Sequence, residues 1–147
     1  MEITGQTNVR SLVCGRGAAR GVAESLGKTL VTTMEVPWAV VRDVVGGEIV
    51  GVHHVDSMEF DVVEAQLADL PDCDTVLAVG GGRAIDFGKY VAWRRGCRLV
   101  TLPTALSVDA FVTPAAGLRR GYQVEYVGEA SPDPLVVDYD VLRTAPT

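Results

Sequence analysis

The sequence has no excess of positive charge. Lys and Arg together number 13 against 19 Asp and Glu, which gives a formal net charge of -6 at pH 7 and a pI near 4.8. Proteins that bind nucleic acid or anionic membranes hold phosphate groups with surplus Lys and Arg. The composition therefore excludes nucleic acid and membrane surfaces as the main partners, while a basic pocket for a single phosphate remains compatible with it.

Long apolar runs and paired cysteine motifs are also missing. No run approaches the roughly 20 residues that span a bilayer, and Met1-Glu2 does not open a signal peptide, so we expect a cytoplasmic protein. The three cysteines, Cys14, Cys73 and Cys97, have no C-x-x-C spacing. We therefore expect reduced cysteines that behave as small apolar residues, and neither a zinc knuckle nor a redox pair.

The 147 residues do have the composition of one compact domain spanning 1–147, with 48% hydrophobic and 22% charged residues. Apolar, β-branched runs alternate with stretches of helical period, which predicts an α/β fold with a mostly parallel sheet and helices on both faces. A small β-hairpin is expected at 117–127, near the C-terminal end. The expected strands are 10–14, 28–33, 48–54, 75–79, 98–102 and 135–138, and the expected helices are 18–26, 36–45, 58–70 and 84–95.

The strand at 75–79 runs directly into three glycines, Gly80–Gly82, and a helix follows at once. Glycines let a backbone approach phosphate oxygens closely, and the N–H groups and dipole at a helix start favour an anion. The expected helix presents Ala84, Phe87 and Val91 to the sheet, with Asp86 in its first turn. The spacing is not G-x-G-x-x-G, so a plain tight turn with Asp86 as a helix cap is the alternative.

A second polar loop, 101–114, follows the next strand along the chain. Carboxyl ends of parallel strands meet at one edge of a sheet, so Thr104, Ser107, Asp109 and Thr113 are expected to converge near the glycine turn. They would there hydrogen-bond a sugar or a carboxamide. Alternatively, these side chains satisfy only the backbone of their own loop.

Together the segments 80–89, 102–109 and 134–138 resemble a known family. The elements G-G-G-x-x-x-D-x-x-K and P-T-x-x-S-x-D occur in order, as in glycerol-1-phosphate dehydrogenases, glycerol dehydrogenases and iron-containing alcohol dehydrogenases. The resemblance is closest to the glycerol-1-phosphate branch. It is good from residue 76 to 146 and loose before that.

The resemblance implies a Rossmann-like nucleotide-binding domain, followed in the family by an all-helical domain, with NAD or NADP as cofactor and a zinc or iron ion between the domains. It implies a polyol or polyol phosphate as substrate, with Asp109 orienting it. The family's metal ligands, an Asp and two His, come from the helical domain that should begin after 145–146, so this half is expected to be incomplete for catalysis alone. The residues implied to bind the cofactor are Gly80, Gly81, Gly82, Arg83, Ala84, Ile85, Asp86, Thr104, Ala105, Leu106, Ser107 and Thr113.

Several alternatives stay open. Either Glu35 is the acidic residue that binds the adenosine ribose or that role is vacant, which leaves NAD and NADP undecided. His53 and His54 are adjacent in a strand, so they should face opposite sides of the sheet and not share a metal ion. A helical partner chain or a homo-oligomer would cover the face left by the missing domain. The competing interpretations are a non-catalytic binding module and a fragment similar to dehydroquinate synthase, a cyclase with the same fold.

Overall fold

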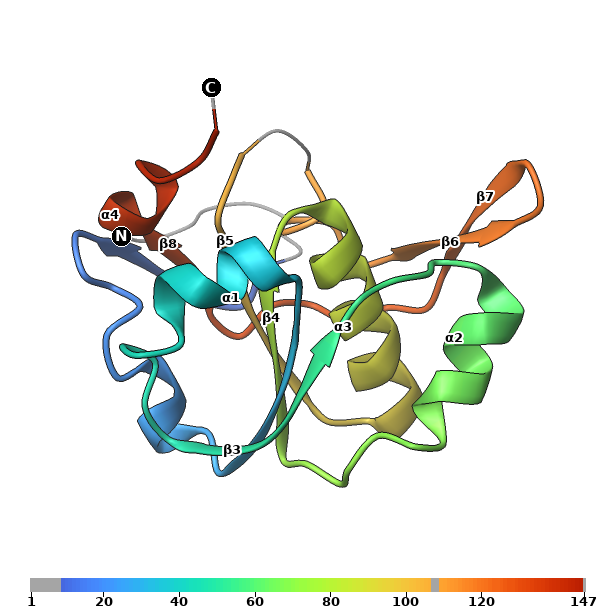
Figure 1. Ribbon diagram of the computed structural model, residues 1–147, viewed down its shortest axis with the longest axis horizontal. Coiled ribbons are helices and arrows are strands. Elements are labelled where there is room, and N and C mark those ends of the chain that lie inside the picture. Colours follow the sequence, from blue (N-terminus) through green and yellow to red (C-terminus); the bar gives the residue numbers. More distant parts are fainter. Residues whose placement is uncertain (1–8, 107–108, 147) are drawn as a thin grey trace.

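The computed structural model describes residues 9–106 and 109–146 (Figure 1). It consists of a six-stranded sheet with helices on both faces and a separate two-stranded hairpin. The strands are β1 (Leu12–Gly15), β2 (Lys28–Thr33), β3 (Glu48–His54), β4 (Thr75–Gly80), β5 (Arg98–Pro103), β6 (Ala116–Arg120), β7 (Gln123–Val127) and β8 (Leu135–Asp138). The helices are the 3-10 turn η1 (Val22–Ser25), α1 (Glu35–Val41), α2 (Phe60–Leu67), α3 (Gly82–Arg95) and α4 (Tyr139–Leu142).

The strand order is β1-β8-β5-β4-β2-β3, and every neighbouring pair in this sheet is parallel. From β2 the chain moves outward to β3, then returns to β4 on the other side of β2 and continues to β5. The direction of winding therefore reverses between β2 and β4. Crevices at the carboxyl ends of strands beside such a reversal are where open α/β sheets bind ligands.

Two apolar clusters cover the two faces of the sheet. One contains Val76 and Ala78 of β4 together with residues of α2, α3 and β6, and the other contains Leu77 and Val79 with residues of η1, α1 and α4. Side chains alternate between the faces of a strand, so β4 is buried on both sides, as its continuous apolar run predicts. Helix α3 packs especially closely, because a Cβ on Gly88 would lie 2.6 Å from the Thr32 hydroxyl.

The predicted fold class is confirmed, and β2, β3 and β8 have the predicted bounds. The helix expected over 18–26 is wrong: the segment forms turns and only the short η1. A side chain far along the sequence explains this, since the Asp138 carboxylate accepts hydrogen bonds from the N–H groups of Gly17 (3.1 Å) and Ala19 (2.8 Å). Gly17 and Gly21 also have φ values of 71° and 67°, which lie outside the range of a right-handed helix.

The remaining helices differ mainly at their ends. Helix α1 stops at Val41, α2 covers only the middle of the expected 58–70, and α3 begins two residues before the expected start. The expected hairpin forms as β6 and β7, which project from the body (Figure 1). The short helix α4 after β8 was not predicted. No helix in the described ranges is long and apolar enough to cross a membrane.

Candidate functional site

The glycine turn at the end of β4 lies where the winding of the sheet reverses. Gly80 has φ 139°, a region that favours glycine, and a Cβ there would lie 3.1 Å from Ala84 of α3 and 3.5 Å from Pro37 of α1. Its carbonyl accepts a hydrogen bond of 3.1 Å from the N–H of Thr104, just after β5. The structure thus brings the glycine turn and the second polar loop together, as the order of the strands predicts.

The start of α3 is open. Gly81 is the N-cap, with an extended backbone (φ -95°, ψ -160°) and no side chain to accept from the helix. The first backbone bond of the helix runs from the N–H of Ile85 to the carbonyl of Gly81, so the N–H groups of the preceding three residues have no partner within the helix. A Cβ on Gly81 would have nothing within 4 Å. The start of α3 therefore presents N–H donors and the positive end of the helix dipole, a combination that favours an anion.

Asp86 does not cap α3, so the alternative that this residue serves only as a helix cap is wrong. It lies beyond the first turn, where its carboxylate pairs with Lys89 at 3.1 Å and accepts a hydrogen bond from the N–H of Gly117. The Lys89 ammonium, 1% exposed, also donates to the carbonyls of Thr113 (2.8 Å) and Ala115 (2.9 Å). The Asp and Lys of the G-G-G-x-x-x-D-x-x-K element thus tie α3 to the segment leading into β6.

Burial acts on both members of this pair. It raises the pKa of Asp86 above its ordinary value, while Lys89 and the Gly117 N–H oppose the rise and the Asp109 carboxylate adds to it. Burial lowers the pKa of Lys89, opposed by the charges of Asp86 and Asp109. Asp109 therefore lies within electrostatic range of Asp86 and Lys89 on α3.

The other predicted residues of the second loop differ in accessibility. Thr104 is 8% exposed, whereas Leu106 is 57% exposed and Asp109 is also exposed. The Thr113 hydroxyl oxygen accepts a hydrogen bond of 3.1 Å from Lys89, so this oxygen already has a partner within the protein. Ala105 is half-buried, and Ser107 lies outside the described residues.

A pocket of about 180 Å³ adjoins the first turns of α3. Among the predicted residues, Arg83 and Asp86 line it, whereas the side chains of Ala84 and Ile85 are buried in the core and can offer a ligand only their backbone. The rest of the lining was not predicted, because nothing in the sequence indicates how the hairpin docks on α3. These further lining residues are Met58, Gly117, Arg119, Val124 and Tyr126.

The two histidines separate as the strand alternation predicts. His53 is half-buried and stacks on Phe87 with ring centroids 4.4 Å apart, and His54 is exposed. Burial lowers the pKa of His53, with Asp56 opposing the shift. Among the described residues, no three His, Cys, Asp or Glu side chains are grouped so that they could hold a metal ion. Glu35 is exposed as the first residue of α1, at the carboxyl end of β2.

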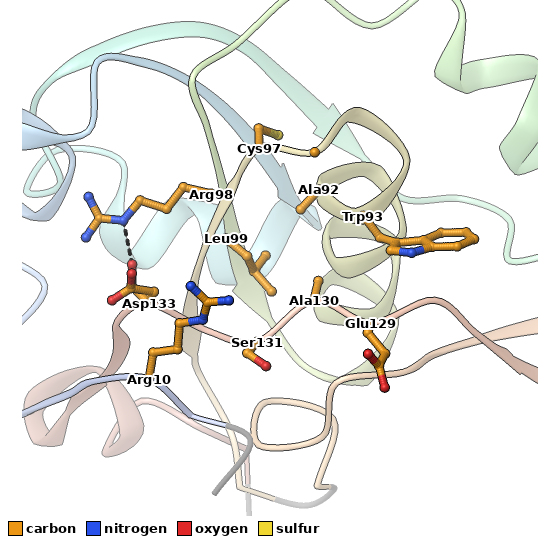
Figure 2. A pocket seen from close by; sticks show the side chains of 11 residues that line it. Arg10, Ala92, Trp93, Cys97, Arg98, Leu99, Glu129, Ala130, Ser131 and Asp133 are labelled. Atoms are coloured by element: carbon orange, nitrogen blue, oxygen red, sulfur yellow. Dashed lines mark hydrogen bonds between the residues drawn. The ribbon is translucent and has the colours of Figure 1, made fainter.

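A larger cavity, of about 530 Å³, lies at the opposite end of α3 (Figure 2). It is lined from the last turn of α3, the start of β5, the segment before β8 and Arg10. None of the predicted site residues lines it. Size alone therefore does not identify the site to which the sequence motifs point.

The parallel sheet, its reversal beside a glycine turn and the two covering helical layers define a Rossmann-like domain. The model of the iron-containing alcohol dehydrogenase family matches residues 31–146, and the chain belongs to this family. It is 30% identical to a glycerol-1-phosphate dehydrogenase of Thermofilum pendens over 93% of this chain and 43% of that protein. A second such enzyme, from Haloquadratum walsbyi, is 32% identical over 82% of this chain and 36% of its own length.

Solved structures agree on the fold. The iron-containing alcohol dehydrogenase of Corynebacterium glutamicum matches with a TM-score of 0.82 at 20% identity, covering 99% of this chain and 44% of that chain. A probable glycerol dehydrogenase from Sinorhizobium meliloti matches with a TM-score of 0.80 at 24% identity, covering 94% and 42%. The chain thus spans less than half the length of these relatives.

Proposed function

We propose that this chain is the nucleotide-binding half of an NAD(P)-dependent, metal-dependent dehydrogenase that acts on a polyol or a polyol phosphate, of the glycerol-1-phosphate dehydrogenase type. Membership of the family and the names of the curated relatives support this class. The observation that carries the proposal is the open helix start at Gly81, at the point where the sheet reverses.

The pyrophosphate of the dinucleotide would lie against Gly81 and Gly82, where backbone N–H groups and the α3 dipole favour an anion. The loop from Thr104 to Ser107 would hydrogen-bond the nucleotide from the β5 side. The pocket beside Arg83 and Asp86 would receive the reacting end of the cofactor, which supplies hydride transfer when bound. Asp109, close to Asp86 and Lys89, would orient a substrate hydroxyl, and the Thr113 hydroxyl would donate a hydrogen bond to the cofactor.

Glu35 would accept hydrogen bonds from the adenosine ribose. Its exposed carboxylate follows β2 beside the reversal of the sheet, the position from which acidic side chains reach this sugar in dinucleotide-binding folds. A carboxylate repels the extra phosphate of NADP, so we propose NAD as the preferred cofactor. We also propose a cytoplasmic location, since the three cysteines lack the paired spacing of a disulfide framework.

A zinc or iron ion would require ligands from outside the described residues, which hold no group of three metal-binding side chains. We propose that a helical domain supplies them, either from a longer form of this protein or from a partner chain. Exposed apolar side chains at the carboxyl edge of the sheet support the proposal that a helical domain packs against this edge. They are Met34 (36% exposed), Val36 (70%), Leu106 (57%) and Tyr139 (48%).

Calorimetric titration with NAD+, NADH, NADP+ and NADPH tests the nucleotide site. We expect binding, tighter for the NAD pair, and its loss in Gly81→Val, whose side chain would enter space that is empty in the protein. If none of the four binds at millimolar concentration, the proposal is overturned. If Glu35→Ala leaves the preference between NAD and NADP unchanged, the role of Glu35 is wrong.

A chimera tests the reaction. Residues 1–146 joined to the carboxyl-terminal part of the Thermofilum pendens relative should oxidise glycerol-1-phosphate when supplied with zinc or iron. Asp109→Ala should abolish turnover in the chimera and leave cofactor affinity unchanged. A chimera that binds the cofactor and a metal ion but turns over neither polyols nor their phosphates would favour a non-catalytic binding module. Light scattering and hydrophobic-dye binding of the unfused chain test whether a helical domain or partner packs on the carboxyl edge of the sheet. A monomer that takes up no hydrophobic dye would contradict that proposal.

A further inference from the structure

Two of the three cysteines meet at the amino-terminal edge of the sheet. Cys73 lies just before β4 and Cys97 just before β5, and these strands are neighbours with Thr75 opposite Arg98. The two side chains are close enough that each thiol shifts the pKa of the other. The spacing of cysteines in the sequence does not predict this contact, because it depends on which strands pair.

A fixed cation stands beside this pair. The Arg95 guanidinium donates to the carbonyls of Leu67 (3.0 Å) and Leu70 (2.7 Å), which holds it at the end of α2, and its charge lowers the pKa of the Cys73 thiol. The interaction with the Cys97 thiol and that with Arg95 outweigh burial and lower the pKa of Cys73 to about 7. The same contact and burial raise the pKa of Cys97. These surroundings favour the thiolate at Cys73 more than at Cys97.

Small reagents can reach the pair. Both cysteines are only partly buried, and Cys97 lines the 530 Å³ cavity between the last turn of α3 and the start of β5 (Figure 2). Redox-sensing cysteines are typically accessible thiolates beside a second thiol that can resolve the oxidised form. Cys14 differs, because it is exposed on β1 and contacts Tyr139 instead of another cysteine.

We propose that Cys73 and Cys97 are a modification site: a dithiol that a peroxide converts to a disulfide between the α2–β4 and α3–β5 connections. The Cys73 thiolate attacks one peroxide oxygen, the O–O bond breaks, and protonation of the leaving oxygen releases water and leaves a sulfenic acid on Cys73. The Cys97 sulfur then attacks the Cys73 sulfur, its proton leaves with the hydroxyl as a second water, and the disulfide forms. One peroxide is reduced by two electrons as two thiols are oxidised.

Peptide mapping of the full chain with Cys14→Ser tests this directly. After stoichiometric hydrogen peroxide and trypsin, residues 43–83, which contain Cys73, should be joined to residues 96–98, which contain Cys97. Dithiothreitol should separate them. Mapping that finds Cys73 as a sulfinic acid, or both thiols unmodified after glutathione in the same tube has been oxidised, would overturn the proposal.

Alkylation with iodoacetamide as a function of pH gives a second test that requires no oxidation. In the Cys14→Ser protein, Cys73 should react half-maximally near pH 7. Replacing its neighbour by Cys97→Ala should move that midpoint upward by about one unit or more, because the largest contribution to the lowered pKa is lost. An unchanged midpoint would show that the two sulfurs do not interact, whatever the outcome for nucleotide binding.

Discussion

Replacing Gly81 by Asp should move stability and nucleotide binding in opposite directions. Gly81 already has the extended backbone of an N-cap, and an added side chain has open space around it. An Asp carboxylate there would accept hydrogen bonds from the free N–H groups of α3 and face the positive end of its dipole. The proposed pyrophosphate would use the same groups, so the new carboxylate would compete with it in space and in charge.

The magnitudes separate the two effects. Better capping, the dipole and the reduced freedom of the unfolded chain each contribute a few tenths of a kcal/mol or more, which together give about 1 kcal/mol of added stability. For a chain of this size that raises the Tm by about 4 °C. NAD affinity should fall at least ~100-fold, equivalent to about 2.7 kcal/mol.

Differential scanning fluorimetry and calorimetric titration measure the two effects on the same preparation. Gly81→Asn is the matched control: it caps the helix without a charge, so it should stabilise the protein and weaken NAD binding less than Asp does. Undiminished affinity in Gly81→Asp would refute the assignment of this turn to the nucleotide. A lower Tm in both variants would refute the reasoning about the open N-cap.

Three further substitutions test the surroundings of this turn. Gly80→Ala should lower the free energy of unfolding in urea by about 1–2 kcal/mol, because alanine is strained at φ 139°. Lys89→Met should lower it by about 3 kcal/mol, since it removes the only cation paired with the Asp86 carboxylate among the described residues, together with the donor to two carbonyls. Asp86→Asn in the same chain should recover part of the loss. Burial alone would raise the pKa of Asp138, but hydrogen bonds from four backbone N–H groups outweigh burial and lower the pKa below 3.8. The Asp138 carboxylate therefore stabilises the fold above pH 3.8, and this stabilisation is lost as the pH falls through the folded-state pKa. Asp138→Asn should therefore reduce the Tm at neutral pH and remove the part of the fall in Tm at acid pH that comes from this carboxylate. A dependence of Tm on pH that is unchanged by the substitution would contradict the role of the carboxylate.

Features set by neighbouring residues in the sequence were predictable. The apolar run of β4, the glycines after it and the helical period of Ala84, Phe87 and Val91 all act locally, and each appears in the fold as expected. The convergence of Thr104 on Gly80 followed from the rule that parallel strands end at one edge.

Features that depend on distant partners were not predictable. Asp86 was expected in a first helical turn, but its actual partners include Gly117 on the far side of the second loop. The turns that replace the helix expected at 18–26 depend on Asp138, more than a hundred residues away in the sequence. Similarly, the contact between Cys73 and Cys97 exists only because β4 and β5 are adjacent.

The hydrogen bond between the Thr104 N–H and the Gly80 carbonyl has a consequence for how tightly a ligand can be held. It links the ends of β4 and β5 without a ligand, so the two segments that would bind a nucleotide are already joined to each other. Many of the contacts to the nucleotide would come from backbone N–H groups, which lose no side-chain conformational entropy on binding. Ordering each flexible side chain at an interface costs about 0.5–1.5 kcal/mol. In such a site less of the favourable contact energy is offset by lost entropy, so more of it contributes to affinity. We expect the site to bind its ligand with little change in conformation.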